Sequence, residues 1–297
     1  MPSPVPFEHL RLRANGISFH ALAAGPADGP LALLLHGFPE LAISWQHQLT
    51  ALAAAGFRAV APDLRGYGGT DKLGPFDLHT LTQDVASLVQ ACGRERATII
   101  GHDWGGAIAW GTAILQPQVV ERLVVLNMPH PAVFARALLT NPRQLLRSWY
   151  MFAFQLPLLP EFILTRDGAA AIARSLRGGS SVRDVWTPEV LAPYRESMQQ
   201  PGAAHAAIGY YRAAFRNPGI LRDAQRHPIA APTKVIWGTS DRFLGLELVD
   251  QTAMRPFFAE GNSPTIELIE GAGHFVQNEA AQRVNAALLH WLCPASA

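Results

Sequence analysis

The sequence predicts an α/β protein with a mostly parallel, doubly wound sheet and an inserted helical segment. Residues 31–35 and 97–100 are continuous apolar runs, which are typical of parallel strands covered on both faces. The helical pattern of residues 78–91 lies between these two runs. Because strands that alternate with helices form parallel sheets, we expect this arrangement in the first half of the chain.

The alternation of strands and helices stops after Leu126 and returns with the apolar run of residues 233–237. The segment between them has few strand signals and is rich in Ala, Leu, aromatic residues and Arg. We therefore predict a core of residues 1–129 and 229–297, with a helical cap of residues 130–228 inserted into it. Caps of this kind exclude water and supply substrate contacts.

The remaining elements follow from local patterns, taken in chain order. The sequence Asn15-Gly16 between two strand patterns predicts a hairpin. The loop of residues 63–71 is rich in glycine, but it lacks the Lys-Ser/Thr ending of a phosphate loop, which argues against nucleotide binding there. We expect strands at 9–12, 17–21, 57–61, 123–126 and 265–269, and helices at about 44–55, 107–115 and 278–292.

Composition limits the classes of function. The 297 residues carry 24 Lys and Arg against 23 Asp and Glu, so nucleic acid and anionic membranes are not expected partners. Cys92 and Cys293 have no metal or redox spacing, which favours a reducing compartment. With no signal-peptide pattern and no apolar run of ~18–20 residues, we expect a cytoplasmic protein without a membrane span.

The six residues 101–106, Gly-His-Asp-Trp-Gly-Gly, stand between a predicted strand and a predicted helix. Strand, Gly-x-X-x-Gly and helix form the pattern of a nucleophile elbow, in which the central residue is exposed on a strained turn. Gly101 and Gly105 allow the strand and the helix to approach closely. The central residue is usually Ser, and here it is Asp103.

An Asp at this position changes the expected chemistry. A carboxylate that attacks an acyl group would form a reactive anhydride, whereas attack on a saturated carbon gives an alkyl ester that water can cleave. The alternative is that Asp103 only caps the helix that follows. The rest of the chain decides between these interpretations.

Two further residues complete a triad with Asp103. Asp241 and His274 each lie on a glycine-containing loop directly after a predicted strand. The chain order of nucleophile, acid and histidine is that of α/β-hydrolase triads, and three residues in this order favour a catalytic role. Glu247 and Asp250 are rival acids on the same loop, but they lie further from the strand end.

The loop after the strand of residues 31–35 supplies part of the predicted oxyanion hole. In elbow hydrolases one N–H follows the nucleophile and another comes from this loop, so we expect the N–H groups of Trp104 and Phe38. Pro39 has no N–H to donate. His36 has no second ligand at metal spacing, so we expect it to be structural and predict no metal site.

Two aromatic stretches lie in the predicted cap, at residues 148–155 and 209–212. Aromatic residues on helices usually belong to a hydrophobic core, so core packing is the first interpretation of both stretches.

Together these motifs resemble the epoxide hydrolases of the α/β-hydrolase superfamily over nearly the whole chain. In that family two cap tyrosines donate hydrogen bonds to the epoxide oxygen and assist ring opening. Tyr211 matches one of them, and Tyr150 matches the other by its spacing from Phe154 and Gln155. The resemblance implies an α/β-hydrolase fold, Asp103 as the nucleophile, His274 as the base oriented by Asp241, and no cofactor. We expect the substrate pocket to be lined by Phe38, Trp104, Phe154 and Phe275.

Two alternatives remain open from the sequence. Haloalkane and haloacid dehalogenases use the same Asp nucleophile, although one group places its acid where this chain has Asn127. Trp104 is compatible with either activity. A non-enzymatic ligand-binding protein on the same scaffold is disfavoured by the complete triad. The expected partners are a small epoxide and water, and the expected assembly is a monomer or a homodimer.

Overall fold

An eight-stranded sheet runs through the part of the chain that the computed structural model describes, residues 7–293. The strand order is β1-β2-β4-β3-β5-β6-β7-β8. β2 is antiparallel to both of its neighbours, and the other neighbouring pairs from β4 to β8 are parallel. The strands are β1 (Glu8–Ala14), β2 (Ile17–Ala24), β3 (Leu31–Leu35), β4 (Arg58–Pro62), β5 (Ala97–His102), β6 (Val120–Leu126), β7 (Thr233–Gly238) and β8 (Thr265–Ile269).

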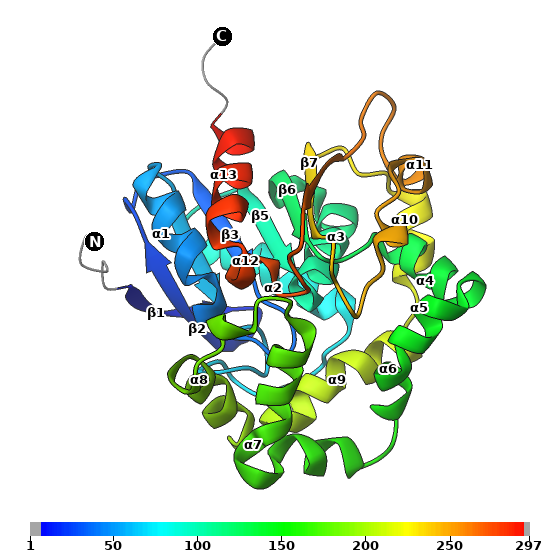
Figure 1. Cartoon of the computed structure of the whole chain (residues 1–297). Coiled ribbons are helices and arrows are strands. Elements are labelled where there is room, and N and C mark those ends of the chain that lie inside the picture. The colour runs from blue at the N-terminus through cyan, green and yellow to red at the C-terminus, as the bar shows by residue number, and fades with distance from the viewer. Residues whose placement is uncertain (1–6, 294–297) are drawn as a thin grey trace.

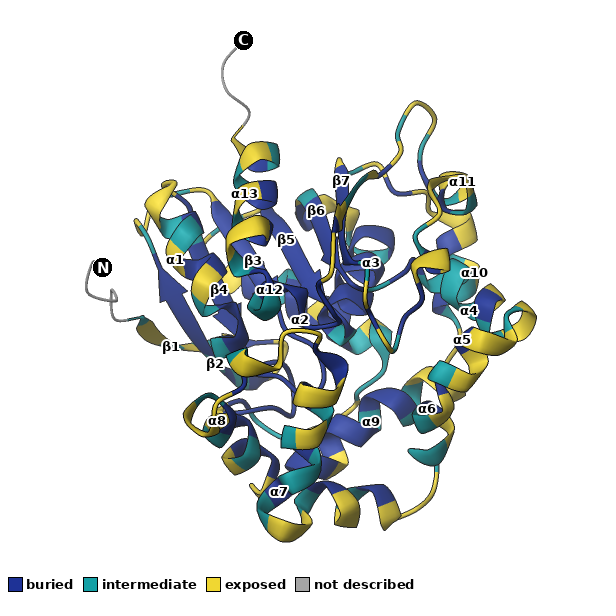
Figure 2. Ribbon diagram, in the orientation of Figure 1, coloured by how far each residue is buried: buried dark blue, intermediate teal, exposed yellow. Residues whose placement is uncertain are grey.

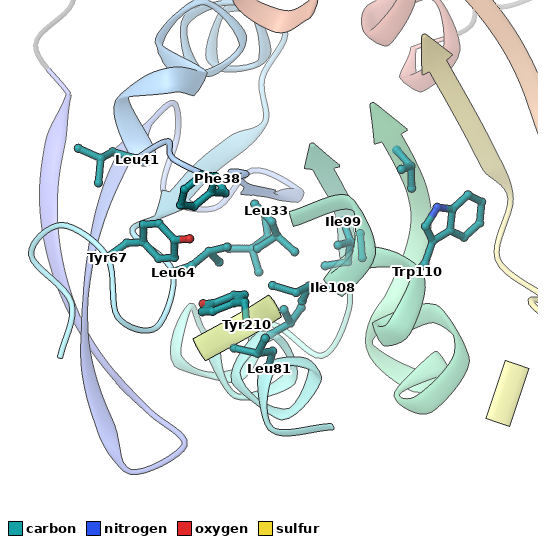
Figure 3. Close-up of a cluster of buried hydrophobic side chains, with 14 of the residues drawn as sticks. Leu33, Phe38, Leu41, Leu64, Tyr67, Leu81, Ile99, Ile108, Trp110 and Tyr210 are labelled. Carbon is teal, nitrogen blue, oxygen red and sulfur yellow. The ribbon is translucent and has the colours of Figure 1, made fainter. Parts of the chain in front are cut away.

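Side chains alternate between the two faces of the central strands and form two cores. Leu33 and Ile99 belong to the core on one face, which Figure 3 shows in part. Leu34 and Ile100 belong to the core on the other face. Every residue of β3 and β5 is buried, as Figure 2 shows for the middle of the sheet. The continuous apolar runs of the sequence are thus explained by helices on both faces.

Helices cover both faces of the sheet. α2 (Leu78–Ala91) and α3 (Trp104–Leu115) pack against each other, and α1 (Gln46–Ala54) packs against α13 (Ala281–Leu292) on the opposite face (Figure 1). One prediction was wrong in detail: residues 278–292 do not form a single helix. α12 (Val276–Glu279) ends before Ala280, whose backbone leaves the helical region at φ −130° and ψ 40°.

The chain between β6 and β7 consists of helices and turns. Figure 1 shows α7, α8 and α9 below the sheet in its view. Three of these helices, α4, α5 and α8, begin with proline, which lacks the N–H that a first helical residue leaves unpaired. The helices are α4 (Pro131–Thr140), α5 (Pro142–Arg147), α6 (Trp149–Ala153), α7 (Leu159–Gly179), α8 (Pro188–Met198), α9 (Ala203–Arg216) and α10 (Ile220–Arg226).

This arrangement is an α/β-hydrolase fold, as predicted. The division into a core of residues 1–129 and 229–297 and a cap of residues 130–228 stays a prediction. Within residues 7–293, none of the helices combines the length and apolar character that crossing a bilayer requires. Because β3, β5, β6, β7 and β8 are parallel, the loops that follow them meet at one edge of the sheet.

Candidate active site

Asp103 lies on the sharp turn between β5 and α3. Its backbone angles are φ 49° and ψ −120°, a conformation that non-glycine residues rarely adopt. A Cβ on Gly105 would collide with the backbone of Leu35, so only glycine lets α3 approach the sheet here. The Asp103 side chain makes no capping hydrogen bond to α3. Helix capping therefore does not account for this residue.

Two backbone donors surround the Asp103 carboxylate. The N–H of Phe38 donates to Oδ1 of Asp103 at 2.8 Å. The neighbouring Gly37 leaves no room for a Cβ, which would collide with the Asp103 side chain. The N–H of Trp104, at the start of α3, has no hydrogen-bond partner among residues 7–293. Of the two donors predicted for the oxyanion hole, the N–H of Phe38 contacts the nucleophile, and the N–H of Trp104 belongs to the residue that follows it in the chain.

His274 lies between two carboxylates. Its Nε2 is 3.4 Å from Oδ2 of Asp103, and its Nδ1 is 2.7 Å from Oδ2 of Asp241. The second oxygen of Asp241 accepts the N–H groups of Phe243 at 2.8 Å and Leu244 at 3.0 Å, which fix the carboxylate. The structure thus brings together the three residues proposed as a triad.

The rival acids on the loop after β7 are engaged elsewhere. Glu247 accepts hydrogen bonds from Asn141 at 3.1 Å and from Arg147 at 3.3 Å. Asp250 caps α11 (Gln251–Met254), with its side chain accepting the N–H of Thr252. Asp241 is therefore the acid of this loop that contacts His274.

Asn127, at the end of β6, supports the acid. Its Nδ2 donates to Oδ2 of Asp241 at 2.7 Å, and its Oδ1 accepts the N–H of Gly238 at 3.0 Å. Its φ of 43° is a conformation in which Asn is enriched. Asn127 therefore positions the carboxylate of Asp241 and is not itself the acid that contacts His274.

The charges of this cluster depend on one another. Burial favours a neutral Asp103, but the hydrogen bond and the positive charge of His274 outweigh burial and lower the pKa of that carboxyl. Burial also opposes charge on His274, yet the carboxylates of Asp241 and Asp103 raise its pKa well above the usual value. Each charge thus favours the other, a carboxylate on Asp103 and an imidazolium on His274.

A second buried network, which the sequence did not reveal, joins the loops around the triad. The Glu40 carboxylate lies 2.7 Å from Nδ1 of His102 and accepts the N–H of Gly37 at 3.1 Å. Nε2 of His102 lies 2.8 Å from the carbonyl oxygen of His274, and Gln277 donates to Glu40 at 2.9 Å. The loops that hold Phe38, Asp103 and His274 are thus tied to one buried carboxylate.

Two tyrosines of the helical segment face the nucleophile. Tyr150 is in α6 and Tyr211 is in α9, and their ring centroids are 6.0 Å apart. Two cavities, of about 320 Å³ and 580 Å³, meet here. Asp103, Tyr150 and Tyr211 are the three residues that line both of them. The two phenols and the carboxylate therefore lie at the junction of the cavities.

Burial determines the protonation of both phenols. It raises the pKa of Tyr150, and the negative charge of Asp103 raises it further. Burial likewise raises the pKa of Tyr211 well above its usual value, with added contributions from Tyr150 and Asp103. Both hydroxyls therefore keep their protons at neutral pH and can donate hydrogen bonds.

Three of the four residues expected to line the pocket do so. Trp104 lines the smaller cavity, and Phe38 and Phe154 line the larger one. Phe275 lines neither cavity, so this prediction was wrong. Its ring is buried between His274, at a centroid distance of 5.0 Å, and Trp186, at 5.5 Å.

His36 takes part in hydrogen bonds through both ring nitrogens. Its Nδ1 lies 2.9 Å from the carbonyl oxygen of Gly37, and its Nε2 accepts the N–H of Leu64 at 3.0 Å. These contacts connect the ends of β3 and β4 and fit the structural role expected of it. Residues 7–293 contain no group of three His, Cys, Asp or Glu side chains placed to hold a metal ion.

Comparison with known proteins agrees with this geometry. Residues 32–287 match the model of the alpha/beta hydrolase family. The chain belongs to the alpha/beta hydrolase family. It is 37% identical to the AB hydrolase superfamily protein YfhM of Bacillus subtilis, over 95% of this chain and 96% of that protein. It is 36% identical to epoxide hydrolase 3 of Xenopus tropicalis, over 96% of this chain and 77% of that protein.

Solved structures give the same result for this family member. Epoxide hydrolase A of Mycobacterium thermoresistibile superposes with a TM-score of 0.82 at 30% identity, over 97% of this chain and 99% of that one. The resemblance to the epoxide hydrolases of the alpha/beta hydrolase family, predicted from the sequence motifs, is confirmed.

Proposed function

We propose that this family member hydrolyses an epoxide to a vicinal diol through an alkyl-enzyme ester on Asp103. The observation that supports this most directly is the junction of the two cavities, where Tyr150 and Tyr211 lie with Asp103. When an epoxide ring opens, its oxygen stays bonded to the substrate and gains negative charge. Two protonated phenols opposite the attacking carboxylate can stabilise this charge by donating hydrogen bonds to the oxygen. The similarity to proteins named epoxide hydrolases supports the same activity.

In the first step the Asp103 carboxylate attacks one ring carbon of the epoxide. The carbon–oxygen bond breaks, and its electron pair goes to the epoxide oxygen, which takes a proton from Tyr150 or Tyr211. The enzyme then holds a hydroxyalkyl ester, a tyrosinate and the His274 imidazolium. Because the ester has no charge, the raised pKa of His274 falls, and its proton passes to the tyrosinate.

In the second step neutral His274, oriented by Asp241, takes a proton from water. The hydroxide adds to the ester carbonyl carbon, and the N–H groups of Phe38 and Trp104 stabilise the oxyanion, each by about 3 kcal/mol in comparable sites. Collapse breaks the bond between that carbon and the alkyl oxygen, which takes the proton from His274. The new Asp103 carboxylic acid returns its proton to His274, and the resting charges are restored.

Diol formation from a small set of epoxides tests the activity. Styrene oxide, an aliphatic terminal epoxide and a trans-disubstituted epoxide are incubated with the protein, and diol is measured by chromatography. A parallel panel of chloroalkanes and bromoalkanes is assayed for halide release. The proposal expects diol and no halide. Halide release without diol would assign the protein to the dehalogenases, and no turnover of either panel would contradict an Asp103-centred hydrolase.

A further inference from the structure

Exposed apolar side chains are concentrated in one part of the chain. Of the 15 large apolar residues that are exposed within residues 7–293, ten lie between residues 139 and 163. Several are almost completely open to solvent: Leu139 is 88% exposed, Leu158 is 79% exposed and Trp149 is 67% exposed. Exposed apolar surface of this extent marks a site of contact with another molecule.

These residues lie on elements that touch one another. α4, α5 and α6 follow each other along one edge of the molecule in Figure 1, and Figure 2 shows exposed residues along α5 and α6. Phe152 of α6 packs against Phe215 of α9, at a ring-centroid distance of 5.3 Å, and both are partly open to solvent. We call the exposed apolar residues between 139 and 163, together with Phe215, the apolar patch.

Arginine accompanies the apolar patch, and acidic residues are missing from the same stretch. Residues 131–160 contain three arginines and no acidic residue. Arg136 precedes Leu139 by three positions in α4, and Arg143 precedes Leu146 by three positions in α5. Residues three apart are neighbours on a helix surface, so positive charge lies beside exposed hydrocarbon on both helices.

Two of these guanidinium groups are not neutralised. Within residues 7–293, Arg136 and Arg143 have no carboxylate within ion-pair distance, and both are exposed. The third arginine of the stretch, Arg147, pairs with Glu247 at 3.3 Å. The apolar patch is therefore bordered by positive charge that is available to an external partner.

The near-zero charge of the whole chain conceals this distribution. Residues 130–228 contain 12 arginines, no lysine and six acidic residues, whereas the whole chain has a net charge of only +1. The rest of the chain is correspondingly acidic. The expectation that anionic membranes are not partners used the average over both parts, and it does not apply to the surface that carries the arginines.

We propose that the apolar patch binds the protein to the surface of an anionic lipid bilayer. The exposed leucines and Trp149 enter the boundary between head groups and acyl chains, and Arg136 and Arg143 contact the lipid phosphates. Helices that combine arginine with exposed Trp, Phe and Leu are typical of segments that lie in the plane of a membrane interface. The amphipathic ring of tryptophan favours the same boundary.

A second copy of the chain is a less suitable occupant of the apolar patch. A symmetric contact brings the same surface of both copies together, so their positive charges would add. Residues 131–160 contain no carboxylate that could pair with the arginines of the other copy. Like charges at an interface oppose association, whereas an anionic lipid surface supplies charge of the opposite sign.

Flotation of the full chain with lipid vesicles tests this inference. Vesicles of phosphatidylcholine alone are compared with vesicles that also contain phosphatidylglycerol, at low and high salt, and the bound fraction is measured. We expect binding to the anionic vesicles that weakens as ionic strength rises, and weaker binding to the neutral vesicles. A protein that stays unbound with anionic vesicles at low salt would overturn the proposal.

Two double variants examine the charge and the apolar surface separately. Arg136→Gln, Arg143→Gln should lower partitioning onto anionic vesicles by roughly tenfold to thirtyfold. Leu139→Gln, Leu146→Gln should weaken binding to both kinds of vesicle, by about tenfold or more. All four residues are exposed and Gln is a good helix former, so thermal unfolding should be nearly unchanged.

Matched controls carry the same substitutions on other surfaces. Arg13→Gln, Arg255→Gln replaces two exposed arginines outside the patch, and Leu73→Gln, Leu268→Gln replaces two exposed leucines outside it. Both controls should bind anionic vesicles nearly as well as the intact protein does. Equal losses in the controls and in the patch variants would show that the patch is not the binding surface.

The oligomeric state decides between lipid and a second copy. Analytical ultracentrifugation without lipid is applied to the intact protein and to Leu139→Gln, Leu146→Gln. A dimer that becomes a monomer in this variant would assign the apolar patch to a second copy and overturn the proposal. Flotation and sedimentation do not depend on catalysis, so their results hold whether or not the protein hydrolyses epoxides.

Discussion

The Glu40 carboxylate and the His102 imidazole lie 2.7 Å apart, and neither side chain is exposed to solvent. Nε2 of His102 faces a second acceptor, the carbonyl oxygen of His274, at 2.8 Å. The ring donates to both acceptors when both nitrogens carry hydrogen, and in that form His102 and Glu40 are a buried ion pair. Burial disfavours the charge of Glu40, but the charge and hydrogen bond of His102 overcome it and lower the Glu40 pKa.

The first prediction concerns Glu40→Gln. Breaking a buried ion pair leaves one charge uncompensated, so we expect the free energy of unfolding to fall by about 3 kcal/mol. Urea denaturation at pH 7 measures it. Glu247→Gln is the matched control, because Glu247 forms an exposed ion pair with Arg147. This substitution should lower the free energy of unfolding by at most about 1 kcal/mol. Equal losses in the two variants would show that the buried pair has no special contribution.

The same variant has a pH signature. Because the pKa of Glu40 is lower in the folded than in the unfolded protein, its contribution is present above its unfolded pKa, about 4.3 in model peptides. It is lost as the pH falls through the lower, folded value. The difference in stability between the intact protein and Glu40→Gln should therefore shrink below about pH 4. A difference that is constant down to pH 3 would contradict an ionised Glu40.

The Glu40–His102 pair also shows what the sequence could not predict. Asp103, Asp241 and His274 were predictable because each follows a strand, and the carboxyl ends of parallel strands meet at one edge. Glu40 and His102 are 62 positions apart, and no local pattern connects them. Their partnership depends on how the loops after β3 and β5 pack, which local patterns do not specify.

The pocket shows a second limit of sequence reasoning. Phe275 was expected to line it because it is next to His274, but adjacent residues project in different directions, and its ring packs against Trp186 instead. Helix packing decides which aromatic residues face the nucleophile, and local sequence patterns do not specify that packing. Tyr150 could therefore be assigned only from the family resemblance and its spacing from Phe154 and Gln155.

A second prediction concerns the phenols. Tyr211→Phe removes one of two donors to the epoxide oxygen and should slow ester formation by about tenfold to a thousandfold, with ester hydrolysis much less affected. Single-turnover kinetics separates the two steps. Tyr210→Phe is the matched control. The hydroxyl of Tyr210 donates to the carbonyl of Arg65 at 2.7 Å, and Tyr210 lines neither cavity. It should lower stability by about 1 kcal/mol without slowing ester formation. If Tyr211→Phe slowed ester hydrolysis most, the assigned role would be wrong.

The two chemical steps should also differ in their dependence on pH. The Asp103 pKa is lowered, and the pKa values of Tyr150 and Tyr211 are raised, so ester formation should be nearly constant from about pH 4.5 to pH 10. Ester hydrolysis needs neutral His274 and should slow as the pH is lowered, because Asp241 still favours the imidazolium. Rapid-quench measurement at pH 5 should therefore find accumulated ester. A loss of ester formation near pH 9 would indicate phenols with lowered pKa values, which would contradict the raised values expected from burial.

The last prediction separates the two steps by mutation. His274→Gln should leave Asp103 able to attack the epoxide but remove the base that activates water, so the alkyl-enzyme ester should accumulate. Intact-protein mass spectrometry should show an increase equal to the full mass of the epoxide, because nothing leaves when the ring opens. A haloalkane processed by a dehalogenase would instead add its alkyl group without the halogen. Peptide mapping should place the adduct on Asp103, and Asp103→Ala should form none. A His274→Gln variant that stays unmodified and turns over at the rate of the intact protein would contradict both the triad and the covalent mechanism.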